Sequence, residues 1–193
     1  MPAPPTSASY AAATSCLGKN LEAMRLMLAN CTAFRTFAGA ANEAEALARI
    51  YQGCLPPPAS NAETYTLAEL QSYRPFAIVM PAPGQAIEYS RMAFGGGNWN
   101  HNRTGEFYIL IERTHPTSGD DDDNDFAWID LVGKIVHSAD SENPGLIELH
   151  EQQSYLSVAG VSIRDIYRAS EEEVNEVGDY QRAHIVLRWG REN

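Results

Sequence analysis

The amino-acid sequence predicts an α+β domain: a mostly antiparallel β-sheet with two main helices packed on one face, long loops and an N-terminal arm. Two segments place apolar residues at helical spacing, and five others show the alternating or continuous apolar pattern of strands. A main helix and a short helix precede three strands, and the second main helix separates these from the last two, which favours antiparallel pairing. The length of 193 residues fits one domain.

The first main helix is predicted from about Ser15 to Cys31, because apolar residues recur there at steps of four and three. These residues are Leu17, Leu21, Met24, Leu28 and Cys31. Asn42, followed three residues later by Glu45, resembles a capping box and opens a short helix that runs through Ile50. Three consecutive prolines then end helical structure, and a connector follows, with room for one turn of helix at its end.

Five strands are predicted, at residues 76–79, 87–92, 107–112, 155–163 and 183–189. The fourth contains a break at Ala159-Gly160, and the segment Glu171–Glu173 is expected to form an exposed turn or the start of a helix. Between the second and third strands lies a stretch rich in glycine and asparagine. We therefore expect a β-hairpin with an extended excursion over residues 93–104.

The second main helix is predicted from about Asn124 to Asp140. Its apolar face is made of Trp128, Leu131, Val132, Ile135 and Val136. An acidic loop over residues 115–124, with four consecutive aspartates at 120–123, precedes this helix. Aspartates at that place cap a helix and complement its dipole.

The charge balance restricts the partners of the protein. Twenty-five acidic and 14 basic residues give a net charge of −11 at pH 7. Such a chain is not expected to bind nucleic acid generally or to dock on an anionic membrane, since both need basic side chains. No run approaches the ~20 apolar residues of a membrane helix. Three cysteines without a C-x-x-C pair fit a reducing compartment.

Residues 1–14 are predicted to be a flexible N-terminal arm. Pro2, Pro4 and Pro5 disfavour a helix there. The segment also lacks the basic residues and the apolar run of a secretory signal, so we expect synthesis in the cytoplasm. The remainder, residues 15–193, is expected to form a single α+β domain.

The motifs that usually indicate catalysis, cofactors or metals are incomplete. An EF-hand frame starting at Asp121 would require glycine and glutamate where Phe126 and Val132 stand. The segment that starts at His150 differs from a zinc helix because Ser154 replaces the second histidine. The triple glycine of the hairpin lacks the Lys-Ser/Thr ending of a phosphate loop. The sequence therefore predicts no catalytic, cofactor or metal residues.

The excursion is the first candidate interaction site. Trp99 and Arg103 are residue types that often form interface hot spots. Asn100 and His101 lie between them, and we expect all four to contact a subunit or another protein. The alternative is a Trp99 side chain folded back onto the sheet.

The chain resembles the tail-terminator and head-to-tail joining proteins of long-tailed bacteriophages. The resemblance rests on element order and a few short segments between about Leu17 and Gly190. These segments are Leu28-Ala29, Phe34-Arg35, Gly39-Ala40, Ala48–Tyr51, Arg74-Pro75 and Val186–Trp189.

This resemblance implies a structural virion protein, not an enzyme, located in the tail–neck region and assembled in the host cytoplasm. It would form a closed ring, of six subunits in such proteins, that caps the tail tube and joins it to the head. Its partners would be other copies of itself, the tail tube protein and a neck or connector protein, with DNA passing through the ring unbound. We expect Asp120, Asp121, Asp122 and Asp123 to line the bore, where carboxylates repel phosphates. The alternatives are another neck or minor tail component, or a small metal-assisted hydrolase that uses the acidic loop.

Overall fold

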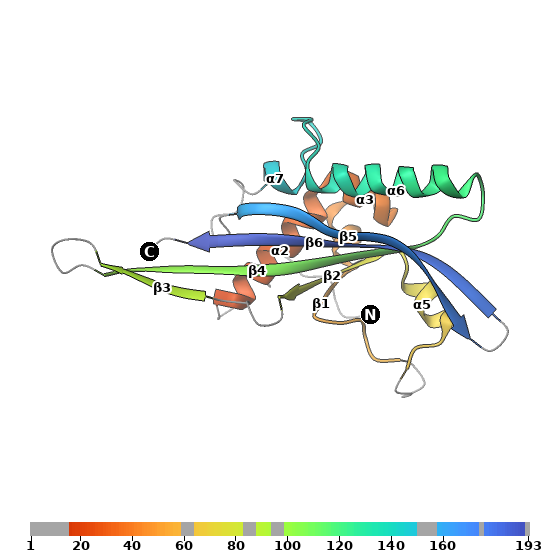
Figure 1. Cartoon of the computed structure of the whole chain (residues 1–193), viewed down its shortest axis with the longest axis horizontal. Coiled ribbons are helices and arrows are strands. Elements are labelled where there is room, and N and C mark those ends of the chain that lie inside the picture. Colours follow the sequence, from red (N-terminus) through yellow and green to blue (C-terminus); the bar gives the residue numbers. More distant parts are fainter. Residues whose placement is uncertain are drawn as a thin grey trace.

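A computed structural model describes residues 16–58, 64–82, 88–93, 99–149, 158–173 and 176–191. In this part of the chain, six strands form one sheet in the order β1-β2-β4-β6-β5, and β3 pairs with the outer part of β4 (Figure 1). The strands are β1 Ile50–Gln52, β2 Phe76–Pro81, β3 Glu88–Ala93, β4 Trp99–Thr114, β5 Val158–Glu173 and β6 Glu176–Arg191. All pairs are antiparallel except β1 with β2. The predicted α+β class is confirmed.

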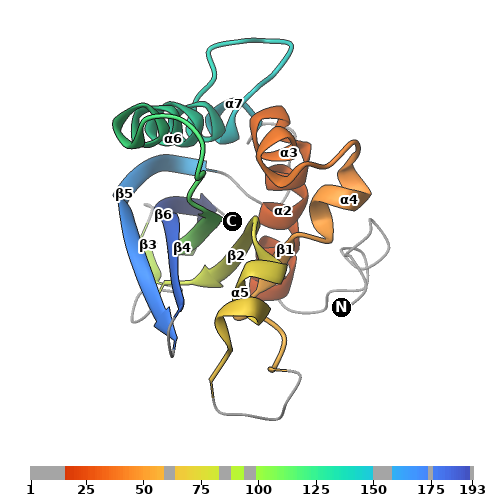
Figure 2. The same ribbon diagram turned by 90° about the vertical axis from the view of Figure 1, so that its right-hand side faces the viewer.

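The two longest helices, α2 and α6, lie with α3, α4 and α7 on one side of the sheet, whereas α5 lies on the other (Figures 1 and 2). The helices are α2 Cys16–Asn30, α3 Thr32–Ala38, α4 Glu43–Leu47, α5 Leu67–Tyr73, α6 Asp121–Val136 and α7 Leu146–Leu149. The predicted cap at Asn42 is present, and the structure adds a second cap that was not predicted. Asn42 accepts a hydrogen bond from Glu45 N at the start of α4, and Thr66 with Glu69 forms a capping box at α5.

Alternation along the strands divides the apolar core between the two faces. On the helix face, Ile109 and Ile111 of β4 pack with α2, α3 and α6, and the predicted apolar face of α2 is buried from Leu21 to Leu28. On the opposite face, Tyr51, Phe76 and their neighbours form a smaller cluster beneath α5. The helix face therefore carries the main hydrophobic stabilisation.

Strand β1 was not expected, because the sequence placed Ile50 in a helix. Ile50 instead pairs with Ala77 of β2, and Arg49 O accepts a hydrogen bond from Ala77 N at 2.8 Å. A three-residue strand is too short to show a period in the sequence, and it forms here because β2 supplies its hydrogen bonds. The prediction of a helix through Ile50 was wrong.

The β5–β6 hairpin is longer than the sequence indicated. The predicted break is confirmed as an irregularity between Val158 and Gly160. The segment Glu171–Glu173 is neither a turn nor a helix start, because it continues β5 and pairs with β6 up to Glu176. One of its carboxylates, Glu171, accepts a 2.8 Å hydrogen bond from Arg74 Nη2, which offsets the charge repulsion of the acidic run.

A buried ion cluster ties the end of α5 to the sheet. Arg74, the residue after α5, donates from Nε to Glu112 of β4 at 2.7 Å, and both side chains are 1% exposed. Arg182 of β6 donates from Nε to the other oxygen of Glu112 at 2.6 Å. The Tyr180 ring lies between the two guanidinium groups, 4.7 Å from Arg74 Cζ and 4.9 Å from Arg182 Cζ. Glu112 therefore holds three elements together.

Candidate functional site

The four residues predicted to contact a partner all lie on β4, in the hairpin that it forms with β3: Trp99, Asn100, His101 and Arg103. Strand β4 begins at Trp99, which pairs with Ala93, so the excursion predicted over residues 93–104 is strand from Trp99 onward. Residues 94–98 lie outside the described part of the chain. In Figure 1 the hairpin extends well beyond the rest of the sheet. A projecting hairpin is suited to reaching a second molecule.

Strand alternation separates one of these four residues from the others. Successive residues of a strand lie on opposite faces, so positions 99, 101 and 103 fall on the same face as Phe107, and Asn100 falls on the other. Phe107 faces the helix layer of the core. The backbone positions 99, 101 and 103 therefore share one face of the strand.

The predicted acidic loop ends earlier than expected, since α6 begins at Asp121. Asp120 is its N-cap and accepts a hydrogen bond from Asp122 N at 2.9 Å. The next three aspartates form the first turn, where negative charge is stabilised by the helix dipole. The helix starts three residues before the predicted Asn124 and ends at Val136 instead of Asp140. The aspartates 120–123 are exposed at one end of the helix.

Arg168 of β5 clamps the start of α6 to the sheet edge. Its guanidinium donates to Asp121 and to Asp179, each at 2.7 Å, and Ser170 donates to the second oxygen of Asp179 at 2.6 Å. Arg168 holds the pKa of the Asp121 carboxyl below its usual value. Ser170 and Arg168 together lower the pKa of Asp179. One of the four predicted bore carboxylates thus has an ionic partner within the same subunit.

A polar contact fixes the middle of α6 on the sheet. Gln181 of β6 is fully buried, accepts a 2.8 Å hydrogen bond from Arg113 Nε and donates to Asp125 of α6. The Arg113 guanidinium also stacks over the Trp128 ring, 5.0 Å from its centre. These contacts set which face of α6 points away from the core.

Helix α6 meets the edge strand β5 at a small pocket. The pocket, called here the α6–β5 pocket, has a volume of about 140 Å³ and is lined by Asp125, Trp128, Ile129, Ile166, Tyr167 and Arg168. Two of its apolar lining residues are exposed to solvent, Ile129 by 50% and Tyr167 by 37%, and the same two elements also expose Phe126 by 68% and Ile163 by 39%. Exposed apolar groups gathered around a pocket indicate a binding surface.

One residue that lines the α6–β5 pocket carries a buried, unsatisfied donor. Trp128 is 1% exposed, and its indole Nε1 has no hydrogen-bond acceptor within the described ranges. A buried N–H without an acceptor costs about 1–3 kcal/mol. The sequence assigned Trp128 to the core and gave no signal for the pocket, because β5 and α6 meet only in the tertiary fold.

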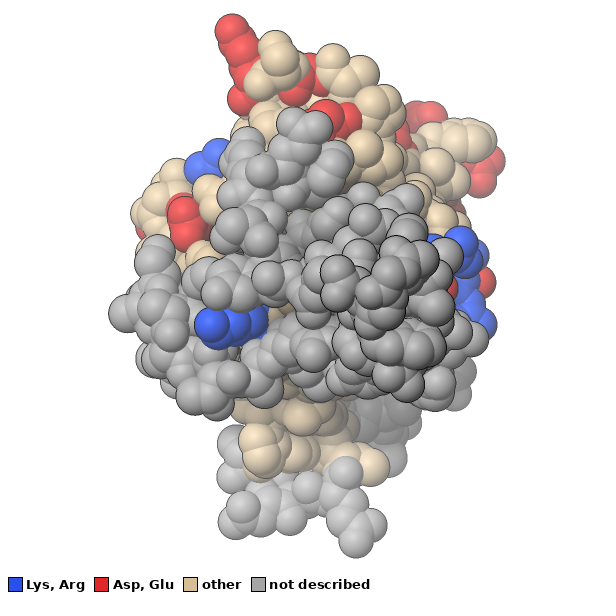
Figure 3. All heavy atoms as spheres, turned by 90° about the vertical axis from the view of Figure 1, so that its left-hand side faces the viewer, with Lys and Arg blue, Asp and Glu red and all other residues tan. Residues whose placement is uncertain are grey.

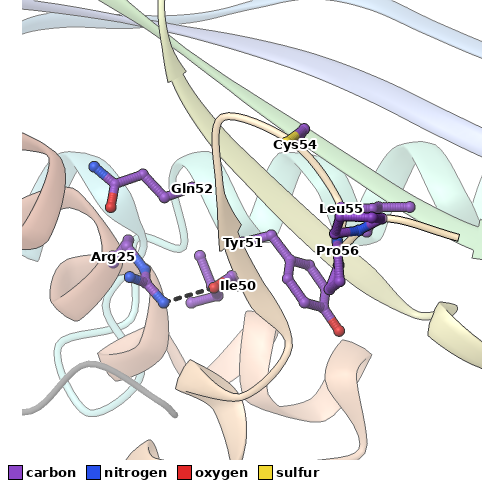
Figure 4. Close-up of a pocket in the computed structure, with 8 residues that line it drawn as sticks. Arg25, Ile50, Tyr51, Gln52, Cys54, Leu55 and Pro56 are labelled. Atoms are coloured by element: carbon purple, nitrogen blue, oxygen red, sulfur yellow. Dashed lines mark hydrogen bonds between the residues drawn. The ribbon is translucent and has the colours of Figure 1, made fainter. Parts of the chain in front are cut away.

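A second pocket lies beside β1 and is larger, with a volume of about 410 Å³. It is lined by Arg25, Ile50, Tyr51, Gln52, Cys54, Leu55, Pro56 and Pro57. Figure 4 shows Arg25 and Gln52 on one side of it and Leu55 and Pro56 on the other. Arg25 Nη2 donates to Ile50 O at 2.8 Å, and burial lowers the pKa of this guanidinium. The hydrogen bond from Arg25 therefore satisfies a backbone carbonyl at the β1 edge of the sheet. An added strand could not use this carbonyl as an acceptor, which disfavours strand addition at that edge.

Charge is distributed unevenly between the layers. Figure 3 views the hairpin end and shows acidic side chains gathered over the helix layer at the top, with basic groups lower, at the level of the sheet. The helix layer includes the aspartates that begin α6 and the acidic segment between α6 and α7, where Asp140 and Glu142 are exposed. This distribution fits an acidic surface on one side of the molecule.

Among the residues described, no group of three or more His, Cys, Asp or Glu side chains is arranged to hold a metal ion. No helix in the same ranges is long and apolar enough to cross a membrane. No protein-family model matches the sequence, and no curated protein matches it either. Function must be argued from the surfaces of the chain itself.

Proposed function

We propose that the protein is a structural virion component: a subunit of a closed ring that caps a bacteriophage tail tube and joins it to the head–neck region. One observation carries the proposal. The projecting β3–β4 hairpin and the exposed apolar α6–β5 pocket lie on different parts of one subunit. A closed ring is built from heterologous contacts, which need two different surfaces on each copy. The α+β fold that the resemblance implies also supports this role.

The ring would have six subunits, with the tail tube protein on one side and a neck or connector protein on the other. Asp120, Asp121, Asp122 and Asp123 are the proposed bore lining, because exposed carboxylates would keep passing DNA from binding. Asp121 shares its charge with Arg168, so the repulsion would come mainly from the other three.

The test is assembly on tail tubes. The full-length chain is mixed with tubes of the corresponding tube protein and imaged by negative stain, and the complexes are measured by native mass spectrometry. We expect a ring at one end of each tube and a discrete multiple of the subunit mass. Bare tube ends together with monomeric chain would overturn the proposal. Binding to a connector without capping the tube would point to another neck or minor tail component.

A further inference from the structure

We propose that the α6–β5 pocket receives the β3–β4 hairpin of a second copy of this chain, in a head-to-tail contact. The inference rests on the proposed ring and names the contact that would build it. Three features support it: the separation of the two surfaces, the apolar rim of the pocket, and the charges on each side.

The two surfaces cannot meet within one subunit. The pocket residue Ile166 pairs with Ala183, which pairs with Ile111 of β4. Trp99 lies twelve residues before Ile111 on the same strand, so the hairpin and the pocket are separated by about 40 Å along the sheet. Figure 1 shows the hairpin at one end of the molecule and the start of α6 at the other. Any contact between them must join two copies, and it leaves a free hairpin and a free pocket at the two ends of the pair.

The pocket offers the chemistry of an anchor site. Ile129 of α6 is an exposed apolar group that lines a cavity of about 140 Å³, the size for one side chain, and Phe126, one turn earlier on the helix, is exposed as well. Burying such side chains contributes about 25 cal/mol per Å² of apolar surface. A segment with one large apolar residue fits this cavity.

The hairpin supplies such a segment and the opposite charge. Trp99 begins β4, and residues 88–93 and 99–104 together carry two arginines, Arg91 and Arg103, against one glutamate. The pocket is lined by Asp125 and Arg168, and Arg168 is itself paired with Asp121 and Asp179, so that three carboxylates accompany one guanidinium. Opposite charges at the rim favour this partner over a like-charged one. The contact requires neither Asp122 nor Asp123, which leaves them for the bore.

The opposite end of the sheet is less suited to this role. At β1 the carbonyl of Ile50 is occupied by Arg25 of the same chain. Strand β5 pairs with β6 on one side only, and from Ile166 to Glu173 its register is regular. An incoming strand could therefore lie beside β5 while its side chain enters the pocket.

The experiment uses full-length chain with one defect at a time. Ile129→Asp places a charge on the pocket rim, Trp99→Ser removes the hairpin anchor, and Ile147→Asp on α7 is the control. Ile147 is also an exposed apolar residue, at 36%, but lies away from the pocket lining. We expect each of the first two variants to self-associate at least about thirty-fold more weakly than wild type, the effect of losing a central anchor. The control should associate like wild type.

Mixing the two defective variants gives the decisive result. The intact hairpin of Ile129→Asp can enter the intact pocket of Trp99→Ser, whereas the remaining hairpin and pocket are both defective. We expect a 1:1 heterodimer by native mass spectrometry, no larger ring, and only monomer from either variant alone. If Trp99→Ser does not fold by circular dichroism, Arg103→Glu replaces it as the hairpin variant.

Other outcomes distinguish the proposed hairpin–pocket contact from the proposed ring. If both variants form rings as wild type does, the contact is wrong and the ring proposal stands. If deletion of residues 2–14 abolishes association while Trp99→Ser does not, the pocket holds the N-terminal segment and the hairpin contact is wrong. If wild type stays monomeric even on tail tubes, both proposals fail.

Discussion

Gly178 of β6 leaves the space that the side chain of Leu67 occupies, since a Cβ at position 178 would lie 2.5 Å from Leu67 Cδ1. Leu67 is the first residue of α5 and is 4% exposed. This close approach seats α5 on the second face of the sheet.

Gly178→Ala is therefore expected to lower the free energy of unfolding by about 1–3 kcal/mol through overpacking. Adding Leu67→Ala should make the double variant less destabilised than the sum of the two single changes, because the clash is removed. Urea unfolding of the four proteins measures this coupling. Gly160→Ala is the control, since a Cβ there meets nothing within 4 Å. Additive effects at 178 and 67 would show that no clash exists.

The buried ion cluster predicts a large cost for removing its central charge. Glu112→Gln removes the carboxylate that Arg74 and Arg182 share and leaves Arg74 only its pair with Glu171, and breaking a buried pair costs about 3–5 kcal/mol. Glu106→Gln on the same strand breaks a pair with Arg188, whose side chain is 69% exposed, and should cost at most about 1 kcal/mol. If denaturant unfolding showed the same loss of unfolding free energy for both variants, the burial of Glu112 would be contradicted.

Arg168 predicts a pH-dependent contribution to stability. It holds the pKa of Asp121 below its usual value, and a carboxyl with a depressed folded pKa adds stability that is present above its unfolded pKa and lost as pH falls through its folded pKa. Arg168→Leu should therefore lower the melting temperature near neutral pH, and the difference should shrink below about pH 3.9, the unfolded value.

Carboxyl NMR titration provides the direct readout. In Arg168→Leu the pKa of Asp121 should rise toward its ordinary value. Asp140, whose pKa is lowered by Asn143 and the Glu142 N–H, should not respond. An unchanged Asp121 pKa would mean that the ion pair does not form in solution.

Thiol chemistry tests the burial of two cysteines. Cys54 is exposed and lines the pocket beside β1, whereas Cys31 is buried and its burial raises the pKa of the thiol. In a Cys16→Ser background, a disulfide reagent should label one thiol of the native protein quickly. Cys54→Ser should abolish this rapid labelling until the protein is unfolded. Fast labelling of Cys31 would contradict the packing of α2 and α3.

Local patterns predicted the long elements well and the short ones poorly. The helix expected from Ser15 to Cys31 is present as α2, because its apolar spacing is long enough to define a period. Strand β1 was missed because its three residues form a strand only next to β2. Glu171 was assigned to a turn because its charge suggested solvent, while its partner Arg74 lies 97 residues away in sequence.

Only part of the candidate site could be predicted from the sequence. The hairpin and the aspartates of α6 are contiguous segments whose composition is unusual, so both could be singled out. The α6–β5 pocket joins Ile129 to Ile166, and nothing local in either segment indicates that they meet. Phe126 and Ile129 fall outside the apolar face predicted for this helix, and their position off that face was a signal of exposure that the prediction did not use.

Strand β4 runs without a break from the hairpin to the ion cluster at Glu112. Its hydrogen-bonded backbone therefore connects the projecting hairpin rigidly to the core. If a neighbouring copy binds the hairpin, strand β4 fixes the orientation of one subunit relative to the next. The curvature of the assembly would then be set by the intrinsic twist of the sheet. The shape of such an assembly would then depend on the backbone conformation of strand β4.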